Sequence, residues 1–551
     1  MSSDPVPSAS SGLRLPVDIR RFPWIRRLAA DYAFNFEALA PFFAGDPAQP
    51  TAWTDAVGRA QAFPRDRQRI AAILRAQQDQ RGAPTAAREA AARLADPQTV
   101  AVVTGQQAGL FGGPLYTLLK ALTAIKLAER VTREHGVPAV PVFWVESEDH
   151  DWAEVSACLV LDAEMQCHTI SLGALPGAGE QPVSAVRLDP SVFAAVEGLR
   201  SVLPPSEFTD EILERASDAY RPGAGMSQAF GRWMESVLGS RGLVVYDSSE
   251  PAAKVLVHRV FARELEMPGA TTRLAAEAGR ALVERGYHAQ VVPHADNIAL
   301  FRLDGVRQTI HFRDGRFVVA EAPVDTAGLL EEARHRPELF SPNVLLRPVV
   351  QDTLFPTVCY VAGPNELAYL AQTKPIYEHF GVPAPLFFPR ASLTLVDSAA
   401  GRFLNRYRLP FEQLQADTEA ALNHLLESQL PRSIEEAYDQ AVASVESTMA
   451  RLAEAVPSID ATLEGAVRSS LGRMQHDLRT LHEKIIHAAK RRNDTLRRQF
   501  ARARAQAFPD GQPQERRVGF VYFLNRYGPA LVDRLEAELS LDMGTHWVLT
   551  I

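Results

Sequence analysis

Four consecutive ionisable residues, Glu148-Asp149-His150-Asp151, follow an apolar stretch of this sequence. A histidine beside carboxylates can act as a general base, because a neighbouring acid stabilises the imidazolium. We therefore interpret the four residues as a catalytic cluster, with His150 removing a proton and the carboxylates orienting it or recognising an amine. The same residues could instead ligate a divalent metal, although no second His or Cys stands at a helical spacing to complete a zinc site. The ordinary alternative is a solvated loop whose aspartate caps a helix.

A glycine-rich segment forms a second candidate site. Glycines let a ligand approach the backbone, and the start of a helix offers unpaired N–H groups to an anion. The segment is neither a Walker A loop nor a Gly-x-Gly-x-x-Gly motif, so a plain tight turn is the alternative. As substrate-binding candidates we take Gly105, Gln106, Gln107, Gly112, Gly113 and Tyr116.

Further polar residues stand near the middle and the end of the chain. Arg347 suits bidentate binding of a carboxylate or phosphate. Glu366 suits an amine, and the alternative is that it serves only its own helix dipole. The substrate-binding candidates here are Asn343, Arg347, Gly363, Glu366 and Tyr369. A basic tract offers Arg491, Arg498 and Arg516 as phosphate-binding candidates for a cofactor, with a solvated helix face as the alternative.

Strand-like and helix-like segments alternate through the first two thirds of the chain, which predicts an α/β fold with a Rossmann-like parallel sheet over residues 19–390. Open parallel sheets bind ligands at the carboxyl ends of their strands, where the polar clusters fall. One helix is expected over residues 113–135 and another over 365–379. The expected strands are residues 99–104, 139–145, 242–247, 357–362 and 386–388.

Several segments depart from this alternation. Residues 1–18 are expected to be a disordered N-terminus, and two insertions into the core are expected around 158–222, which is irregular, and 290–345, which has antiparallel strands. Residues 391–551 are interpreted as a helical domain with a C-terminal return strand. Its helices, expected over 433–455 and from about 460 to 505, form an antiparallel coiled coil or, alternatively, an ordinary bundle. The apolar seam is Val467, Leu471, Met474, Leu478, Leu481, Ile485 and Ala488.

Composition limits the classes of function. The chain has 551 residues and a formal net charge of −8, which gives no reason to expect a nucleic-acid partner. Its three cysteines cannot make a disulfide framework. No stretch approaches the roughly 20 apolar residues that span a bilayer. We therefore expect a cytoplasmic enzyme that does not act on a membrane.

The motifs resemble those of a known family. Residues 103–117 with Lys120, and residues 142–151, are similar to the two long signatures of the BshC family, the proteins assigned to the cysteine-adding step of bacillithiol synthesis. The resemblance extends from about residue 20 to the end of the chain. It implies a Rossmann-like core related to class I aminoacyl-tRNA synthetases, a connecting insertion and a coiled coil through which homodimers form. It also implies an adenine-nucleotide pocket distinct from the main cleft.

The implied reaction adds L-cysteine to the amine of glucosaminyl-malate, giving bacillithiol. A free carboxylate needs activation to form an amide, so ATP or another adenine nucleotide is the expected cofactor, and no metal is expected. The sequence lacks the His-x-Gly-His and Lys-rich loops of class I synthetases, so the means of activation stays open. Two other functions stay open as well. One is a non-catalytic nucleotide- or metabolite-binding protein that assembles partners through its arm, and the other is a metal-dependent transferase or hydrolase using residues 148–151.

Overall fold

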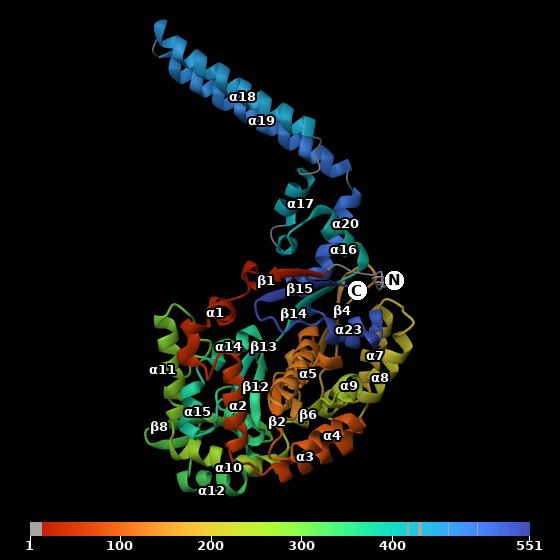
Figure 1. Ribbon diagram of the computed structural model, residues 1–551, viewed down its shortest axis with the longest axis vertical. Coiled ribbons are helices and arrows are strands. Elements are labelled where there is room, and N and C mark those ends of the chain that lie inside the picture. The colour runs from red at the N-terminus through yellow and green to blue at the C-terminus, as the bar shows by residue number, and fades with distance from the viewer. Residues whose placement is uncertain (1–13, 416–417, 428–431, 461, 493) are drawn as a thin grey trace, which may run out of the picture. The chain divides into compact units, whose positions relative to one another are not determined.

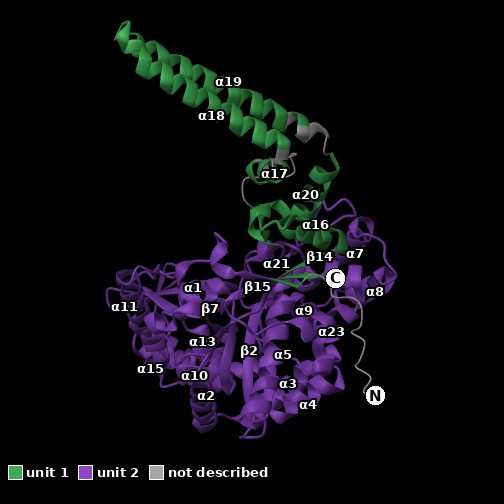
Figure 2. Cartoon of the chain, turned by 45° about the horizontal axis from the view of Figure 1, so that its top comes forward, with its two compact units in different colours: residues 1–15, 394–513, 548–551 green, residues 16–393, 514–547 purple. Residues whose placement is uncertain are grey.

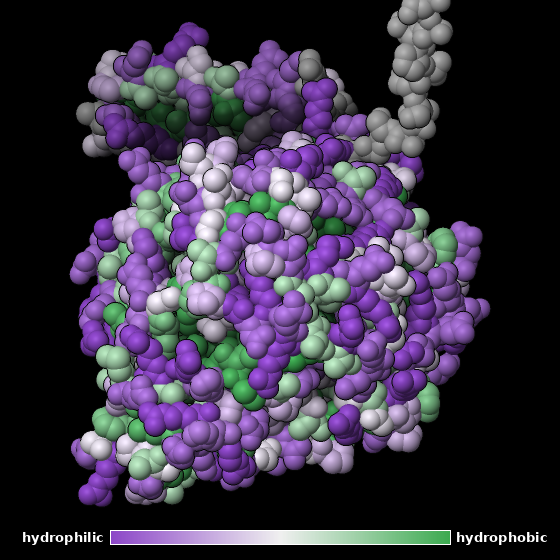
Figure 3. Space-filling view, turned by 60° about the horizontal axis from the view of Figure 1, so that its bottom comes forward, coloured by the Kyte–Doolittle hydropathy of each residue, from purple (hydrophilic) through white to green (hydrophobic). Residues whose placement is uncertain are grey.

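A computed structural model describes residues 14–415, 418–427, 432–460, 462–492 and 494–551 (Figure 1). The chain forms two compact units (Figure 2): unit 1 comprises residues 1–15, 394–513 and 548–551, and unit 2 comprises residues 16–393 and 514–547. Residues 514–547, which the sequence analysis placed with the helical domain, thus belong to unit 2. Hydrophilic side chains predominate on the face shown in Figure 3. Within the described residues, no helix combines the length and apolar character that crossing a membrane requires.

The centre of unit 2 is a five-stranded parallel sheet, as the alternation of segments predicted. Its strands are buried on both faces, which explains why they read as continuous apolar runs instead of alternating ones. In spatial order the strands are β13 (Leu386–Pro389), β12 (Thr357–Ala362), β2 (Val100–Gln107), β3 (Ala139–Glu146) and β6 (Val244–Asp247).

Helices pack on both faces of this sheet. Successive side chains of a strand point to opposite faces, so Val102 of β2 packs with α2 and α5, whereas Val103 packs with α3 and α10. The helices of this layer and its N-terminal extension are α1 (Arg27–Phe34), α2 (Pro50–Ala62), α3 (Arg67–Arg81), α4 (Thr85–Arg93), α5 (Leu115–His135), α9 (Met226–Leu238), α10 (Pro251–Glu266), α11 (Ala270–Glu284) and α13 (Arg347–Leu354). The expected helix over 113–135 is α5.

The segment expected as one helix over 365–379 is instead two, α14 (Pro364–Leu370) and α15 (Lys374–Phe380). Pro375 stands in the first turn of α15. A proline there has no N–H to continue a preceding helix, and the Thr373 hydroxyl caps the Leu370 carbonyl at 2.7 Å.

Both expected insertions are present, and each contains regular strands and helices. Residues 158–222 were expected to be irregular, but they contain most of a hairpin of β4 (Ala157–Leu161) and β5 (Cys167–Ser171), followed by α7 (Ser191–Val202) and α8 (Thr209–Ala219). The second insertion is an antiparallel sheet, as predicted, with a turn at Asp314-Gly315 where both residues have positive φ. Its strands are β7 (Asn297–Asp304), β8 (Val306–Arg313), β9 (Arg316–Val319), β10 (Ala322–Val324) and β11 (Phe340–Pro342), with α12 (Thr326–His335) before the last.

The N-terminal expectation was wrong for residues 14–18, which form β1 (Arg14–Asp18). This strand belongs to a three-stranded sheet ordered β1, β15 (Thr545–Thr550) and β14 (Ser392–Val396). Its partner strand comes from the other end of the chain, so no local pattern could reveal the pairing. The rest of the expected disordered segment, residues 1–13, lies outside the described residues. The expected C-terminal return strand is β15.

Unit 1 is mainly helical, and its arm is the antiparallel pair of α18 (Arg432–Ala455) and α19 (Leu463–Arg492). The two helices lie side by side in both views (Figures 1 and 2). The His482 ring stacks on Tyr438 at 4.2 Å between centroids, and Gln475 donates to Glu446 at 2.9 Å. The long second helix expected to reach residue 505 corresponds to α19 and α20 (Asp494–Ala507), and residue 493 between them lies outside the described residues. The other helices of unit 1 are α16 (Ser398–Tyr407) and α17 (Thr418–Glu427).

The predicted seam of α19 is only half covered. Leu471, Leu478 and Ile485 are partly buried. Met474 and Leu481, which alternate with them, are 43% and 54% exposed. The second row of the apolar stripe on α19 is therefore open to solvent.

Candidate functional site

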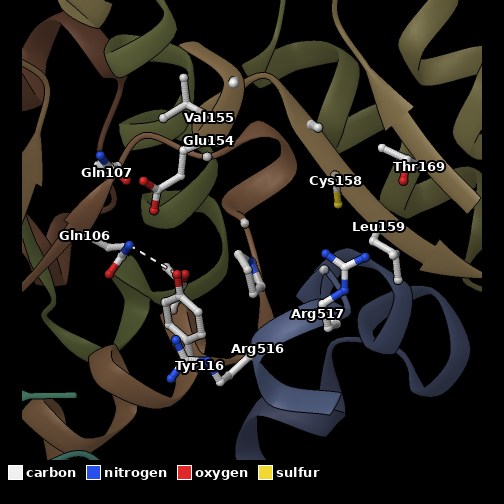
Figure 4. Close-up of a pocket in the computed structure, with 17 residues that line it drawn as sticks. Gln106, Gln107, Tyr116, Glu154, Val155, Cys158, Leu159, Thr169, Arg516 and Arg517 are labelled. Atoms are coloured by element: carbon white, nitrogen blue, oxygen red, sulfur yellow. Dashed lines mark hydrogen bonds between the residues drawn. The ribbon is translucent and has the colours of Figure 1, made fainter. Parts of the chain in front are cut away.

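Two adjoining cavities lie in unit 2 where β2 and β12 end and α5 and α14 begin. The larger measures about 320 Å³ and the smaller about 140 Å³. Both are lined by Gln106, Tyr116 and Arg516. The larger is also lined by Gln107, Gly113, Thr117, Glu154, Cys158 and Arg517 (Figure 4). The smaller is also lined by Lys120, Gly363, Asn365, Glu366 and Arg390.

Two glycines turn the chain between β2 and α5, and they do different things. Gly112 and Gly113 have φ of +91° and +74°, values that glycine adopts without strain. A Cβ on Gly112 would lie 2.1 Å from the ring of Phe520, so this glycine serves the packing of α22 (Phe520–Tyr527). Gly113 lines the larger cavity, and the atom nearest to a Cβ there would be Thr117 Oγ1 at 3.4 Å. Gly113 therefore leaves its backbone accessible to a ligand.

Thr117 stands in the first turn of α5, beside this loop. Its hydroxyl is fully buried and has no hydrogen-bond partner among the described residues. A buried hydroxyl without a partner costs free energy, so an acceptor or donor on a bound molecule would satisfy it.

The two glutamines at the end of β2 bond to different neighbours. Gln106 Nε2 donates to the Tyr116 hydroxyl at 3.2 Å (Figure 4), and Gln107 Nε2 donates to Asp149 Oδ2 at 2.9 Å. Burial raises the pKa of Tyr116 to about 12. Its hydroxyl therefore stays protonated at neutral pH and can donate a hydrogen bond to a substrate.

Glu366 is the acid of the smaller cavity, held by several donors. The donors to its carboxylate are the Gly363 N–H at 2.7 Å, Lys120 Nζ at 2.5 Å, and the hydroxyls of Tyr360 at 2.9 Å and Tyr369 at 3.4 Å. Burial on its own would raise the pKa of Glu366, but Lys120, the Gly363 N–H and Arg347 together outweigh it and the pKa is lowered. Glu366 is thus a carboxylate at neutral pH. Its carboxylate also caps the first turn of α14 by accepting from the Gly363 N–H, which agrees with the alternative that Glu366 serves its own helix.

Lys120 belongs to the glycine-rich motif but was not predicted as a site residue. It is fully buried, and its Nζ also donates to the Gly105 carbonyl at 2.6 Å. Burial lowers its pKa. Gly105 itself lies within β2, where a Cβ would meet the Trp144 carbonyl oxygen at 2.8 Å. Its part in the site is therefore to present a carbonyl to Lys120.

Tyr369, which bonds to Glu366, and Arg347, which bonds to Tyr369, do not line either cavity. Arg347 Nη2 donates to the Tyr369 hydroxyl at 2.8 Å, and its Nε lies 3.7 Å from Glu146 Oε2. Although burial disfavours a charged guanidinium, the surrounding tyrosine and carboxyl groups hold the pKa of Arg347 well above its usual value. Arg347 is thus a fixed positive charge beside the site.

Three arginines close the other side of the cavities. Arg390 is buried and forms two hydrogen bonds with Glu515, at 2.9 and 2.7 Å, so its charge is already matched. Arg516 and Arg517 are exposed on α21 (Gln514–Arg517). Arg516 forms no side-chain hydrogen bond or ion pair with another residue that the structure describes. It is therefore a cation available to a ligand of either cavity.

The expected cluster of residues 148–151 does not form one site. Glu148 is buried and accepts hydrogen bonds from Lys254 at 2.6 and 2.7 Å, so it is a partner in an internal ion pair. Asp151 caps the short helix α6 (Trp152–Val155) by accepting from the Glu154 N–H at 3.1 Å. The described residues include no group of three His, Cys, Asp or Glu side chains placed to hold a metal ion.

Asp149 and His150 do not line the larger cavity, although Asp149 accepts a hydrogen bond from Gln107, which does. Asp149 Oδ1 lies 3.3 Å from Arg307 Nη1 and 3.4 Å from His150 Nδ1. The His150 side chain is 54% exposed. The acid that does line the larger cavity is Glu154, which the sequence analysis missed. Burial raises its pKa, as do Asp151 and Asp149. In the sequence, the only indication of Glu154 was its position in the first turn of the helix that Asp151 caps.

The remaining candidates lie elsewhere. Asn343 Oδ1 accepts from the Leu345 and Leu346 N–H groups at 2.9 and 3.2 Å, so it shapes the turn that leads into α13. Arg498 is exposed on α20 of unit 1. The side chain of Arg491 lies outside the described residues. Of the three cofactor candidates, Arg516 is the one that lines these cavities.

Comparisons with known proteins agree with these motifs. Residues 16–391 match the model described as "Bacillithiol biosynthesis BshC, N-terminal Rossmann-like domain", and residues 393–551 match "Bacillithiol biosynthesis BshC, C-terminal coiled-coil domain". A protein of Salinibacter ruber named "Putative cysteine ligase BshC" is 35% identical, covering 97% of this chain and 98% of that protein. Proteins of the same name from Chlorobaculum tepidum and Koribacter versatilis are each 34% identical to this chain. The match to the first covers 81% of this chain and 82% of that protein. The match to the second covers 94% of this chain and 96% of that protein. The chain belongs to the BshC family of bacillithiol biosynthesis.

Proposed function

We propose that this chain is a ligase that joins the carboxyl group of L-cysteine to the amine of glucosaminyl-malate, forming the amide bond of bacillithiol. The name cysteine ligase carried by its relatives supports this reaction class. The observation that carries the proposal is the pair of adjoining cavities with the shared residues Gln106, Tyr116 and Arg516. A condensation must hold two molecules with their reacting atoms about 3–3.5 Å apart. Two cavities that share a wall suit this requirement.

The lining residues match the charges of these substrates. Glucosaminyl-malate carries carboxylates and an amine, and cysteine carries one of each. Arg516 and Arg517 suit carboxylates, while Glu366 and Glu154 suit ammonium groups or accept their protons.

A cysteine carboxylate must be activated before it reacts, and we propose ATP or another adenine nucleotide as the activating substrate. In activation, a carboxylate oxygen bonds to a phosphorus of the nucleotide and a phosphoanhydride P–O bond breaks, releasing the rest of the phosphate chain or the shortened nucleotide. The amine nitrogen then attacks the acyl carbon, the C–N bond forms, the bond from the acyl carbon to the phosphate-bearing leaving group breaks, and the amine gives up a proton. Glu154 lines the larger cavity and is the group we assign to accept this proton. Arg516 is the residue we assign to the cysteine carboxylate, before and after the activating group is attached to it.

Mass spectrometry of thiol products tests the proposal directly. The purified protein is incubated with glucosaminyl-malate, cysteine and ATP, and with each omitted in turn. Bacillithiol should form only in the complete mixture, or with another nucleotide if ATP is not the donor. Binding of the substrates without product under any nucleotide would contradict the ligase proposal and favour a non-catalytic metabolite-binding protein.

A further inference from the structure

We infer that the two cavities divide the substrates, with cysteine in the smaller cavity and glucosaminyl-malate in the larger one. This assignment rests on the ligase function proposed above. Cysteine is the smaller substrate, and the cavities differ in volume, about 140 against 320 Å³.

The lining of the smaller cavity fits a zwitterion. Its two buried cations already have partners, Lys120 with Glu366 and Arg390 with Glu515. The cation left for a carboxylate is Arg516. Among the described residues, Glu366 Oε1 accepts from two tyrosine hydroxyls, one of them at a long 3.4 Å, so it has capacity for an ammonium hydrogen. An amino acid with its ammonium at Glu366 and its carboxylate at Arg516 satisfies both groups.

The position of Arg516 also orients the substrates. Because Arg516 lines both cavities, a carboxylate bound to it lies at their junction, beside Gln106 and Tyr116. That is where an amine arriving from the larger cavity can reach the acyl carbon. The ring of Tyr116 and Pro364 offer apolar contact for a short side chain such as that of cysteine.

The larger cavity provides what a bulkier dicarboxylate needs. Arg517 lines this cavity and not the smaller one, and the unpartnered Thr117 hydroxyl lies at its wall. Together with the Gly113 backbone at the start of α5, these groups can bind the malate carboxylates. Glu154, on the same cavity, is then close to the sugar amine.

Two exposed residues allow a matched test, because each lines one cavity only: Asn365 the smaller and Arg517 the larger. The KM of each substrate is measured by bacillithiol formation, with the other substrate and nucleotide saturating. Asn365→Phe, which fills the smaller cavity, should raise the KM of cysteine about tenfold or more and change that of glucosaminyl-malate less than about threefold. Arg517→Gln should do the reverse.

Glu366→Gln provides a second arm and should raise the cysteine KM as Asn365→Phe does. Thermal unfolding of each variant shows whether the fold is retained, and the exposed positions of Asn365 and Arg517 make those variants the decisive ones. If wild-type protein forms no bacillithiol, the ligase proposal itself fails. If bacillithiol forms but Asn365→Phe raises the KM of glucosaminyl-malate instead, or if Arg517→Gln raises that of cysteine, the division of substrates is overturned while the ligase function stands.

Discussion

The ammonium of Lys120 and the carboxylate of Glu366 lie 2.5 Å apart, although 246 positions separate them in the chain. The Lys120 side chain is 2% exposed and the Glu366 side chain 23%. The pair joins the first helix after β2 to the first helix after β12, at the edge of the sheet where both cavities lie. It therefore fixes the geometry of the smaller cavity and ties two strand ends together.

Removing one member of this pair should destabilise the protein. Lys120→Met leaves the Glu366 carboxylate without its cation, and breaking a buried ion pair typically costs about 3–5 kcal/mol of the free energy of unfolding. The double variant with Glu366→Gln should recover part of that loss, because no uncompensated charge remains. Urea denaturation of the single and double variants measures both effects. A single variant as stable as wild type would show that the pair contributes nothing to the fold.

The proton acceptor can be identified from the dependence of turnover on pH. A base works only when deprotonated, and the pKa of Glu154 is raised by burial, so turnover should fall with acidity at a higher pH than for an ordinary glutamate. Glu154→Gln should lower kcat by roughly 10²–10⁴-fold and remove this acid limb. His150→Gln should reduce kcat much less, since His150 is half exposed and lines neither cavity. The opposite ranking would restore the histidine that the sequence suggested.

A buried acid that lines neither cavity should control stability at alkaline pH. Burial raises the pKa of Glu264 from 4.5 to about 7. The folded state therefore binds the proton more tightly than the unfolded state, so its contribution to stability is greatest below pH 4.5 and is lost as the pH rises through 7. Glu264→Gln keeps a group that bonds to Thr271 and the Ala299 N–H. This variant should exceed wild type by about 3 kcal/mol in unfolding free energy at pH 8 and lose that advantage near pH 5. If the gain in unfolding free energy of Glu264→Gln did not depend on pH, titration of Glu264 would not be its cause.

The two apolar rows of α19 should behave differently on substitution. Leu478 and Ile485 are partly buried in the arm, so changing both to Asp should disrupt the helix pair and lower helicity by circular dichroism. Met474 and Leu481 are open to solvent, and we propose that they contact a second copy of the chain. Changing these two to Asp should preserve helicity but yield monomers in light scattering. A dimer that survives this change would exclude the open row as the contact.

The two glycines of the loop should separate folding from binding. Gly112→Ala places a methyl group against Phe520 and should mainly lower stability. Gly113→Val projects into the larger cavity and should weaken glucosaminyl-malate binding by calorimetry at least tenfold, or about 1.4 kcal/mol. Unchanged affinity after Gly113→Val, in protein that remains folded, would mean that the loop is only a turn.

The sequence by itself determined the central architecture. A strand that is buried on both faces has a short apolar sequence, as residues 100–107 and 139–146 do. The segments between such strands have the apolar spacing of helices. The parallel sheet could therefore be predicted from local sequence. The long 4-3 spacing of apolar residues likewise identified the arm. The glycine motif marked the turn after β2, because the φ values of Gly112 and Gly113 are a local property.

The tertiary structure alone decided which polar residues meet. Glu148, Asp149, His150 and Asp151 are adjacent in sequence, yet one is paired internally with Lys254, one caps α6 and the other two line neither cavity. Lys120, Glu366 and Arg516 are far apart in sequence, yet they line one cavity. The physical reason is that the carboxyl ends of parallel strands converge at one edge only once the crossovers are packed. Whether a charged side chain faces that edge or the interior depends on contacts that no local pattern encodes.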